Sequence, residues 1–284
     1  MPTPSKISPQ LREWILTTTG DGHSVEAVLR LMQDSGYDPR QSRRIVAQVL
    51  KLSPAAMHAG TATAAPSGLR PTHPEAPEVR IGGHTIGISL SVETPALRVL
   101  ENLLSAEECA GLIAQAKPRL QRALTVDAEG RQQVDQRRTS EGMFFAPRES
   151  PLVADIEQRL AKLLGVPASH GEGLQVLHYL SGQEYEPHFD WFDPDQPGYA
   201  AITAAGGQRI ASVVMYLNTP ARGGGTAFPE LGLTVTARRG SAVYFAYEGG
   251  DQSSLHAGLP VVQGEKWIAT KWLRERPYGA PRKA

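Results

Sequence analysis

The sequence lacks the features that define several large classes of protein. It contains one cysteine, Cys109, in 284 residues, which excludes a disulfide framework and a zinc site built from several cysteines. Cys109 lies in the pattern LLSAEECAGLI, and we interpret it as a small apolar helix residue rather than a nucleophile. A single thiol also suits a reducing compartment.

Long apolar runs and a surplus of one charge are missing as well. No run approaches the ~18 apolar residues that span a bilayer, and the segment MPTPSKISPQ has no basic region followed by an apolar one, so we expect neither a membrane span nor a secretory signal. Lys and Arg together number 29, as do Asp and Glu. We therefore expect no nucleic acid and no acidic membrane as a partner. The missing membrane span, the missing secretory signal and the single thiol together predict a cytoplasmic protein.

The chain is predicted to have three parts. Three helical patterns in residues 1–52 predict a small helical bundle, which resembles the ubiquitin-associated type of three-helix module in size and rhythm. Modules of this type bind protein partners, and a folded extension without a ligand is the alternative. Residues 53–79 are rich in Pro, Ala, Gly and Thr, which predicts a flexible linker. Residues 80–284 are predicted to form a large domain.

The large domain begins with helical patterns and continues as short strands. Ser105 with Glu108 forms a capping box, and Ser150 followed by Pro151 begins a second helix that Gly165 ends. The β-rich runs that follow are LQVLHYL, RIASVVMYLN, GLTVTA, SAVYFAY and KWIATKWL. This order predicts an α+β fold in which supporting helices pack on one face of a β-sandwich or jelly roll.

A histidine and an aspartate lie two positions apart in the segment YEPHFDW. On an extended segment the side chains of His188 and Asp190 project to the same side, and Phe189 points to the opposite face, into the core. An imidazole and a carboxylate held together in this way are two potential metal ligands. A polar pair at an exposed strand edge is the alternative interpretation.

A third ligand has to come from elsewhere in the chain. The other histidines lie in the N-terminal parts, in turns beside glycine, or on an apolar strand: His23, His58, His73, His84, His170 and His178. The remaining candidate is His256, in SSLHAGLPV, where a loop enters a strand. Two ligands on one strand and a histidine on a distant strand form the 2-His-1-carboxylate arrangement of non-haem Fe(II) oxygenases.

Lys266 follows His256 by ten residues, in the apparently buried strand GEKWIATKW. A buried lysine needs an anionic partner. Glu265 is the nearest acid in the sequence, and it faces the other way on a strand. The carboxylate of a bound small molecule is therefore the expected partner of Lys266.

These segments resemble the catalytic domain of the prolyl 4-hydroxylases, which are Fe(II)- and 2-oxoglutarate-dependent dioxygenases with a double-stranded β-helix, or jelly-roll, fold. The resemblance covers roughly residues 98–276. It is carried by the segments QVLHYLSGQEYEPHFDWF, RIASVVMYLNTPARGGGTAFPE, RRGSAVYF, SSLHAGLPVVQGEKWIATKWLRE and RRTSEGMFF. Residues 1–79 lie outside it.

The resemblance implies a role for each matching residue. His188, Asp190 and His256 correspond to the iron ligands, and Lys266 to the residue that pairs with the distal carboxylate of 2-oxoglutarate. The resemblance also implies that Tyr179 and Thr226 bind the same carboxylate. Tyr216 is expected either to line the cosubstrate pocket or to be a core residue. The residues that flank or hold the target proline and its peptide are Tyr185, Trp272, Arg209 and Arg138.

The reaction implied is hydroxylation of prolyl residues in a peptide or protein, with O₂ consumed, succinate and CO₂ released, and ascorbate as an auxiliary reductant. The same chemistry on a free amino acid or another small molecule is the first alternative. A non-catalytic β-sandwich that binds partners through its helical module is another alternative, but the retention of all three ligand residues and Lys266 argues against it. A cupin-type zinc or manganese protein explains the histidines but leaves Lys266 unexplained. The segment 193–208 is expected to be either a lid over the substrate or a plain connector.

Overall fold

The computed structural model describes residues 7–20, 25–51, 77–126, 132–134, 137–247 and 252–279. The chain divides into two compact units, residues 1–65 and 66–284. Most of the predicted linker, residues 53–76, lies outside the described residues. The first described strand after it, β1 (Glu78–Ile81), spans the predicted start of the large domain at residue 80.

The first unit contains the helices α1 (Pro9–Gly20), α2 (Val25–Asp34) and α3 (Pro39–Leu50). Helix α3 begins as its sequence predicts: the carboxylate of Asp38 accepts a hydrogen bond from the backbone N–H of Gln41 at 2.9 Å, and a proline occupies the first turn. The apolar faces of the three helices share a small core made of Ile15, Val28, Leu29, Met32, Ile45, Val46 and Val49.

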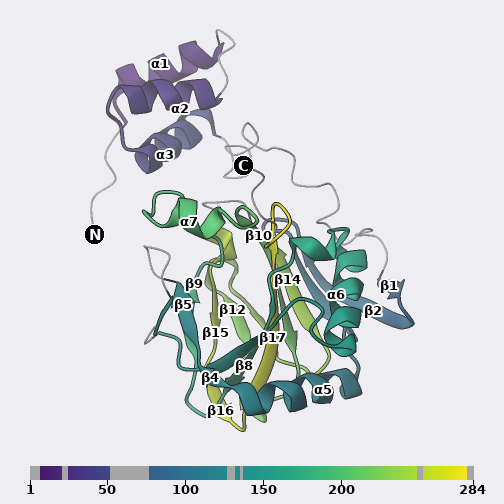
Figure 1. The fold of residues 1–284 in the computed structure, drawn as a ribbon. Coiled ribbons are helices and arrows are strands. Elements are labelled where there is room, and N and C mark those ends of the chain that lie inside the picture. Colours follow the sequence, from purple (N-terminus) through teal and green to yellow (C-terminus); the bar gives the residue numbers. More distant parts are fainter. Residues whose placement is uncertain are drawn as a thin grey trace. The chain divides into compact units, whose positions relative to one another are not determined.

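The second unit is a sandwich of two antiparallel sheets (Figure 1). Among the described residues, the large sheet has the strand order β1-β2-β3-β14-β10-β17-β8-β7-β4, and the small sheet has the order β13-β12-β15-β9. Two short pairs, β5 with β6 and β11 with β16, lie outside these sheets. The sandwich confirms the predicted jelly roll.

The bounds of the strands follow the predicted β-rich runs closely. The large sheet also contains β2 (His84–Val92), β3 (Leu97–Glu101), β4 (Gln121–Arg122), β7 (Glu141–Phe145), β8 (Leu174–Tyr179), β10 (Arg209–Tyr216), β14 (Ala242–Ala246) and β17 (Lys266–Arg274). The small sheet contains β9 (Tyr185–His188), β12 (Thr226–Phe228), β13 (Leu233–Val235) and β15 (His256–Gly258). The short pairs are β5 (Leu124–Val126) with β6 (Gln132–Val134), and β11 (Arg222–Gly223) with β16 (Val261–Gln263).

Helices α5 (Ala106–Ala116) and α6 (Pro151–Leu164) cover the outer face of the large sheet (Figure 1). The capping box at the start of α5 is present: Glu108 N–H donates to Ser105 Oγ at 3.1 Å, and Ser105 N–H donates to Glu108 Oε2 at 2.8 Å. Helix α6 ends at Gly165, which adopts a left-handed conformation with a φ of 66°. The described residues also contain the short helices η1 (Lys117–Arg119), η2 (Ala168–His170), α7 (Tyr199–Thr203), η3 (Pro229–Leu231) and η4 (Gln252–Ser254).

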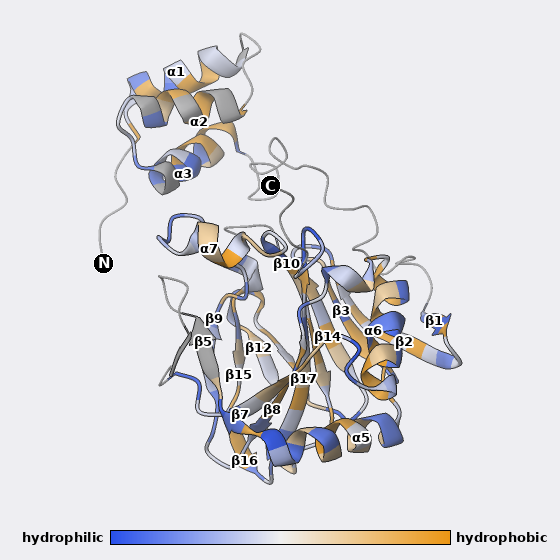
Figure 2. Ribbon diagram, viewed as in Figure 1, coloured by the Kyte–Doolittle hydropathy of each residue, from blue (hydrophilic) through white to orange (hydrophobic). Residues whose placement is uncertain are grey.

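The central strands of the large sheet are apolar along most of their length (Figure 2), because both of their faces are buried. On β17, Trp267 and Ala269 pack on the outer side against the helices. Lys266, Ile268 and Thr270 alternate with them and face the space between the sheets. The outer face thus stabilises the fold, and the inner face is free to carry the site.

Cys109 is fully buried in α5, which confirms its interpretation as a small core residue. Burial raises the pKa of its thiol to about 11, so the thiol stays protonated and is a poor nucleophile at neutral pH. No helix in the described part of the chain is both long and apolar enough to cross a bilayer.

Candidate active site

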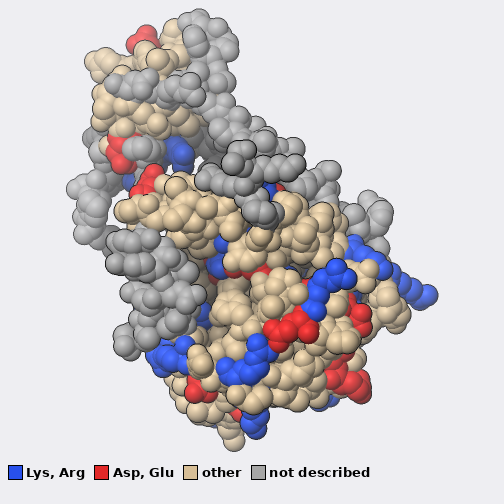
Figure 3. Space-filling model, in the orientation of Figure 1, with Lys and Arg blue, Asp and Glu red and all other residues tan. Residues whose placement is uncertain are grey.

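A cavity of about 1160 Å³ opens between the two sheets. Its walls come from the inner faces of β8 and β17, from β9 and β15, and from the segment that contains α7. In the space-filling view, the face below α7 is hollowed, and basic and acidic side chains lie in the hollow (Figure 3). The cavity contains both polar groups and aromatic rings, as binding sites for organic ligands usually do.

His188 and His256 lie directly opposite each other on the paired strands β9 and β15. Each ring is fixed by a bond to the backbone two residues earlier: Nδ1 of His188 lies 2.8 Å from Glu186 O, and Nδ1 of His256 lies 3.0 Å from Ser254 O. A carbonyl oxygen can only accept, so each Nδ1 carries the hydrogen and each Nε2 keeps a free lone pair. Both rings are therefore in the tautomer that can bind a metal ion through Nε2.

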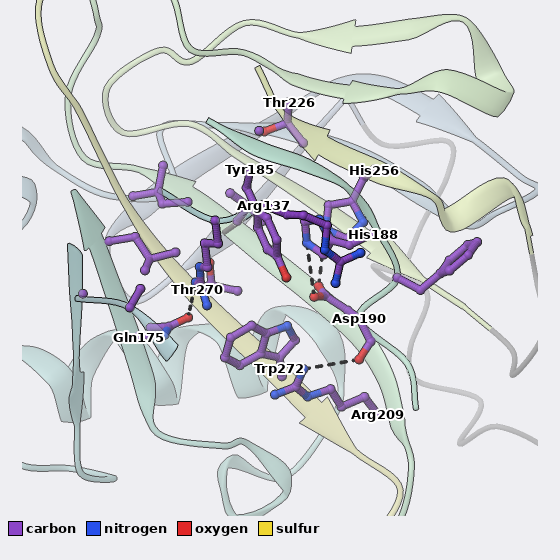
Figure 4. A pocket seen from close by; sticks show the side chains of 18 of the residues that line it. Arg137, Gln175, Tyr185, His188, Asp190, Arg209, Thr226, His256, Thr270 and Trp272 are labelled. Atoms are coloured by element: carbon purple, nitrogen blue, oxygen red, sulfur yellow. Dashed lines mark hydrogen bonds and ion pairs between the residues drawn. The ribbon is translucent and has the colours of Figure 1, made fainter. Parts of the chain in front are cut away.

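Asp190 completes the cluster. Its Oδ1 lies 3.8 Å from His188 Nε2, and its Oδ2 lies 3.6 Å from His256 Nε2. One ligand atom from each of the three residues lies within 4.8 Å of the others. Figure 4 shows the three side chains pointing toward one another in the pocket wall. Two imidazole nitrogens and one carboxylate oxygen at this spacing fit a divalent transition metal, with coordination positions left for other ligands.

The protonation states of these groups also suit a metal ion. Burial, together with the neighbouring His256, lowers the pKa of His188 to about 3, so that this imidazole is neutral at physiological pH. Burial opposes ionisation of Asp190, but the two imidazoles hold the pKa of its carboxyl group below the usual range. A neutral imidazole and an ionised carboxylate are the forms that coordinate metals.

The structure corrects the position of Phe189. We predicted that this ring enters the core, on the assumption that the strand continues through Asp190. However, β9 ends at His188, and the strict alternation of faces ends with it. Phe189 is only half-buried, lines the cavity, and lies against Trp191 with ring centroids 5.1 Å apart.

Lys266 begins β17 and lines the same cavity from the large sheet. Its side chain is 2% exposed, and within the described part of the chain its Nζ is in no ion pair or hydrogen bond and lies 5.3 Å from the ring centre of Tyr179. Burial lowers its pKa to about 8. As expected, Glu265 does not reach it: that carboxylate pairs with His178 at 2.7 Å instead. A buried ammonium group facing a cavity is a strong candidate site for an anionic ligand.

The other residues that we assigned to the cosubstrate pocket surround Lys266. Tyr179 and Thr226 are buried and line the cavity. Tyr216 is also buried, but it is not among the cavity-lining residues, and its hydroxyl donates to Thr226 Oγ1 at 2.8 Å. Its prediction as a lining residue is therefore corrected: Tyr216 acts on the cavity only through Thr226, whose own O–H proton it leaves available to a ligand.

Tyr185 and Trp272 both line the cavity beside the metal-ligand cluster. The Tyr185 ring stacks on His188 with centroids 3.6 Å apart. Trp272 is 7% exposed and lies against the exposed ring of Phe144, with centroids 6.4 Å apart. Figure 4 shows both side chains in the pocket wall, Tyr185 from β9 and Trp272 from β17.

Arg209 is engaged within the protein. Its Nε and Nη2 donate to the two carboxylate oxygens of Glu172 at 2.6 and 2.9 Å, and its Nη1 donates to the backbone oxygen of Asp190 at 3.3 Å. The guanidinium group also lies over the Trp272 ring, 3.9 Å from its centre. The expectation that Arg209 holds peptide carbonyls is therefore revised, because most of its donors are already used: it organises the cavity wall.

Arg138 is likewise more buried than expected for a residue that contacts a peptide directly. It is 5% exposed, donates to Gln175 Oε1 at 2.9 Å, and lies over the Tyr185 ring at 5.1 Å. It does line the cavity. Its contacts place it behind the aromatic wall that Tyr185 forms.

The segment 193–208 is not featureless, since it contains α7. Four of its side chains line the cavity: Asp193, Gln196, Tyr199 and Ile202. Its end is fixed by Gln208, whose side chain accepts from Phe192 N–H at 2.9 Å and donates to Phe192 O at 2.6 Å. The segment therefore forms part of the cavity wall.

Three residues near the cluster were not identified from the sequence. Ser212 Oγ donates to Asp190 Oδ2 at 2.5 Å, and the Tyr247 hydroxyl lies 3.2 Å from Ser212 Oγ. Glu172 binds Arg209, as described above. A signal did exist for Ser212, because it shares the inward face of β10 with the apolar residues Val214 and Tyr216. A polar side chain among buried apolar neighbours is expected to have a buried hydrogen-bond partner.

Comparison with known proteins agrees with this geometry. Residues 174–274 match the model of the 2OG-Fe(II) oxygenase superfamily. The chain is 39% identical over 208 residues to probable prolyl 4-hydroxylase 3 of Arabidopsis thaliana, covering 65% of this chain and 71% of that one. It is 40% identical over 208 residues to prolyl 4-hydroxylase 5 of the same plant, covering 65% and 70% of the two chains. A solved viral collagen prolyl hydroxylase from Paramecium bursaria Chlorella virus-1, in complex with 2OG, aligns over 63% of this chain and 95% of that chain, with 30% identity and a TM-score of 0.51.

Proposed function

Because the chain belongs to the prolyl 4-hydroxylase family of the 2OG-Fe(II) oxygenase superfamily, we propose that it hydroxylates prolyl residues in a peptide or protein. The reaction uses 2-oxoglutarate and O₂ and releases succinate and CO₂. One observation carries the proposal: His188, Asp190 and His256 converge in the same cavity that the buried ammonium group of Lys266 faces.

In this proposal His188, Asp190 and His256 hold Fe(II). Bound Fe(II) supplies the redox chemistry that couples oxidation of 2-oxoglutarate to hydroxylation of a C–H bond. The protein fixes the ligands: both Nδ1–H groups are held by backbone carbonyls, and the carboxylate is held by Ser212. Because three side chains form the cluster among the described residues, a bound ion would keep coordination positions for 2-oxoglutarate and O₂.

Lys266 would bind the distal carboxylate of 2-oxoglutarate. Its Nζ has no acceptor within the described part of the chain, and Thr226 retains a hydroxyl proton to donate to the same group because Tyr216 donates to Thr226. Tyr179 lies directly opposite Lys266 on β8 and closes this end of the pocket. An ion pair in a dry site is strong enough to select a dicarboxylate over a monocarboxylic acid.

The size of the cavity favours a peptide over a free amino acid. Its volume of about 1160 Å³ lies above the ~300–1,000 Å³ range of pockets for small ligands, and 2-oxoglutarate would occupy only the part between the metal ligands and Lys266. Tyr185 and Trp272 are placed to flank a proline ring beside the metal ligands. Hydroxylation of a free amino acid or another small molecule is the alternative that the assay below separates from this one.

Two further expectations remain proposals. We propose that ascorbate supports turnover as an auxiliary reductant, on the basis of the family. We also propose a protein partner for the N-terminal helices, supported by the exposed apolar side chains Trp14, Leu16, Leu31 and Tyr37. A cytoplasmic location remains a prediction from the sequence.

The test is an assay of the purified full chain with Fe(II), ascorbate and 2-oxoglutarate, read as succinate formed and as a 16-Da mass increase of the substrate. We expect a proline-containing peptide to raise succinate formation and to gain the oxygen atom. We expect His256→Ala to abolish both. Hydroxylation of free proline but of no peptide in a proline-peptide array would overturn the peptide assignment, and unchanged succinate formation by His256→Ala would overturn the metal site.

A further inference from the structure

The three members of the ligand cluster are held in place in different ways. His188 and His256 belong to the paired strands β9 and β15, and each ring is tied to a backbone carbonyl. Asp190 lies beyond the end of β9, so no strand ladder fixes its position. Its backbone oxygen accepts from Arg209 at 3.3 Å and its carboxylate accepts from Ser212 at 2.5 Å. The orientation of this carboxylate therefore depends on side chains from another strand.

The hydrogen bonds around Ser212 have a definite direction. An ionised carboxylate can only accept, so the single hydroxyl proton of Ser212 is donated to Asp190 Oδ2. Ser212 Oγ then has only lone pairs left, so the hydroxyl of Tyr247, 3.2 Å away, is the donor in the second bond. Burial raises the pKa of Tyr247 well above its ordinary value, so its hydroxyl keeps its proton. The chain of donors runs from Tyr247 through Ser212 to Asp190.

All three groups of this chain are removed from solvent: Ser212 is 0% exposed, Tyr247 5% and Asp190 7%. At a buried site, water cannot fully replace a hydrogen-bond partner that is removed. Hydrogen bonds in series also strengthen one another where the dielectric constant is low. Oδ2 is occupied by this donor, whereas Oδ1 accepts no hydrogen bond from any described residue. Oδ1 is therefore the carboxylate oxygen with more lone pairs left for an ion.

We propose that Ser212 and Tyr247 are positioning residues of the metal centre, which orient the Asp190 carboxylate so that Oδ1 is presented to the ion. Neither residue touches the metal or the substrate in this assignment. The inference rests on the proposed function only in taking His188, Asp190 and His256 as the metal ligands. It makes no use of 2-oxoglutarate, of O₂ or of the identity of the substrate.

The test measures binding of Co(II) alone to the full chain, by calorimetry and by the visible absorption of the bound ion. We expect Ser212→Ala to weaken Co(II) binding about 10- to 100-fold, the usual cost of removing a group that orients a metal ligand. Tyr247→Phe should weaken it by a smaller factor, on the order of 2- to 10-fold. Ser212→Thr keeps the hydroxyl and should retain binding near the level of the natural protein.

The double variant separates a relay from two independent effects. If Tyr247 acts only through Ser212, then Tyr247→Phe adds nothing once Ser212 is alanine, and the double variant binds Co(II) like Ser212→Ala. Ser241→Ala is the matched control, because Ser241 is equally buried but donates to the backbone oxygen of Arg238. We expect its Co(II) affinity to be unchanged.

The possible results distinguish this inference from the proposed function. If His256→Ala abolishes Co(II) binding while Ser212→Ala stays within twofold of the natural protein, the positioning role is wrong and the metal site stands. If His256→Ala binds Co(II) normally, the ligand assignment itself is wrong. Full additivity of the two hydroxyl variants contradicts the relay. If Ser212→Ala does not fold, an unchanged Co(II) affinity in Tyr247→Phe still contradicts the positioning role.

Discussion

Lys266 and Tyr179 lie directly opposite each other on the adjacent strands β17 and β8, and the Lys266 Nζ is 5.3 Å from the centre of the Tyr179 ring. The aromatic face and the surrounding apolar side chains offer this ammonium group little compensation for its burial. Without a ligand, Lys266 therefore weakens the fold. The predictions for this residue follow from that cost.

Lys266→Met should stabilise the protein without ligands at pH 7 and impair use of 2-oxoglutarate. Replacing an unpaired buried charge with an apolar side chain of similar length should raise the free energy of unfolding by about 1–3 kcal/mol. The KM for 2-oxoglutarate should rise at least about tenfold, since a buried ion pair is lost. Thermal unfolding and succinate assays measure the two effects.

Lys271 is the matched control, because it is a buried lysine on the same strand that does have a partner. Its Nζ donates to Glu157 Oε1 at 2.5 Å. Lys271→Met should therefore destabilise the protein, by about 3–5 kcal/mol, because it leaves Glu157 buried and unpaired. If both methionine variants shift stability in the same direction, the distinction drawn between the two lysines is wrong.

The pH dependence of 2-oxoglutarate binding should follow Lys266. Its pKa is about 8 in the folded protein, below the ordinary value of 10.5. Affinity for 2-oxoglutarate should therefore fall as pH rises above about 8, because the lysine loses its charge. Calorimetry with Mn(II) in place of Fe(II), in two buffers of different ionisation enthalpy, should show proton uptake on binding near pH 8.5. A flat affinity from pH 7 to 9.5 contradicts this prediction.

The lowered pKa of Lys266 also makes the stability of the protein depend on pH, but in the opposite direction to 2-oxoglutarate affinity. The folded pKa lies below the unfolded one, so between about pH 8 and pH 10.5 the unfolded state binds more protons. The contribution of Lys266 to the free energy of unfolding therefore rises with pH across this window and is fully unfavourable below it. Comparing the natural protein with Lys266→Met isolates this effect, since the gap in stability between them should narrow as pH rises from 8 to 10.

Arg209→Ala should destabilise the chain and disturb the cavity wall. Among the described residues it leaves Arg274 as the one ion-pair partner of the Glu172 carboxylate, and it removes the contact with the Trp272 ring. We expect a loss of about 3–5 kcal/mol in the free energy of unfolding. Arg122→Ala is the control: this arginine lines the same cavity but is exposed, so stability should change by less than about 0.5 kcal/mol. Equal losses in the two variants would refute the structural role of Arg209.

Trp272→Ala should separate peptide binding from use of 2-oxoglutarate. The ring lines the cavity beside the metal ligands, where it lies against Arg209 and Phe144. We expect a peptide KM at least about tenfold higher, since an aromatic wall contributes on the order of 1–3 kcal/mol. Peptide-independent succinate formation and the KM for 2-oxoglutarate should be nearly unchanged. A parallel rise of both KM values contradicts this assignment.

The prediction and the structure agree where contacts are local, and they differ where a strand ends or where a residue contacts distant parts of the chain. The capping residues Ser105, Asp38 and Gly165 lie where the sequence places them, because capping depends only on neighbours within a few residues. Phe189 does not, because the alternation of a strand was extended past its last paired residue. Tyr216 and Arg209 were predicted to contact bound ligands. In the structure they hydrogen-bond to partners within the protein, Thr226 and Glu172.

The sequence by itself determined the helices, the β-rich runs and the four chemically unusual side chains: two histidines and a carboxylate of metal-ligand type, and a lysine in an apolar strand. Short-range periodicity and the chemistry of single residues suffice for that. Only the tertiary structure decided that β9 and β15 pair so that His188 faces His256, that Glu172 occupies Arg209, and that Ser212 and Tyr247 reach Asp190. These contacts join residues tens of positions apart, and their geometry depends on strand register, which no local pattern specifies.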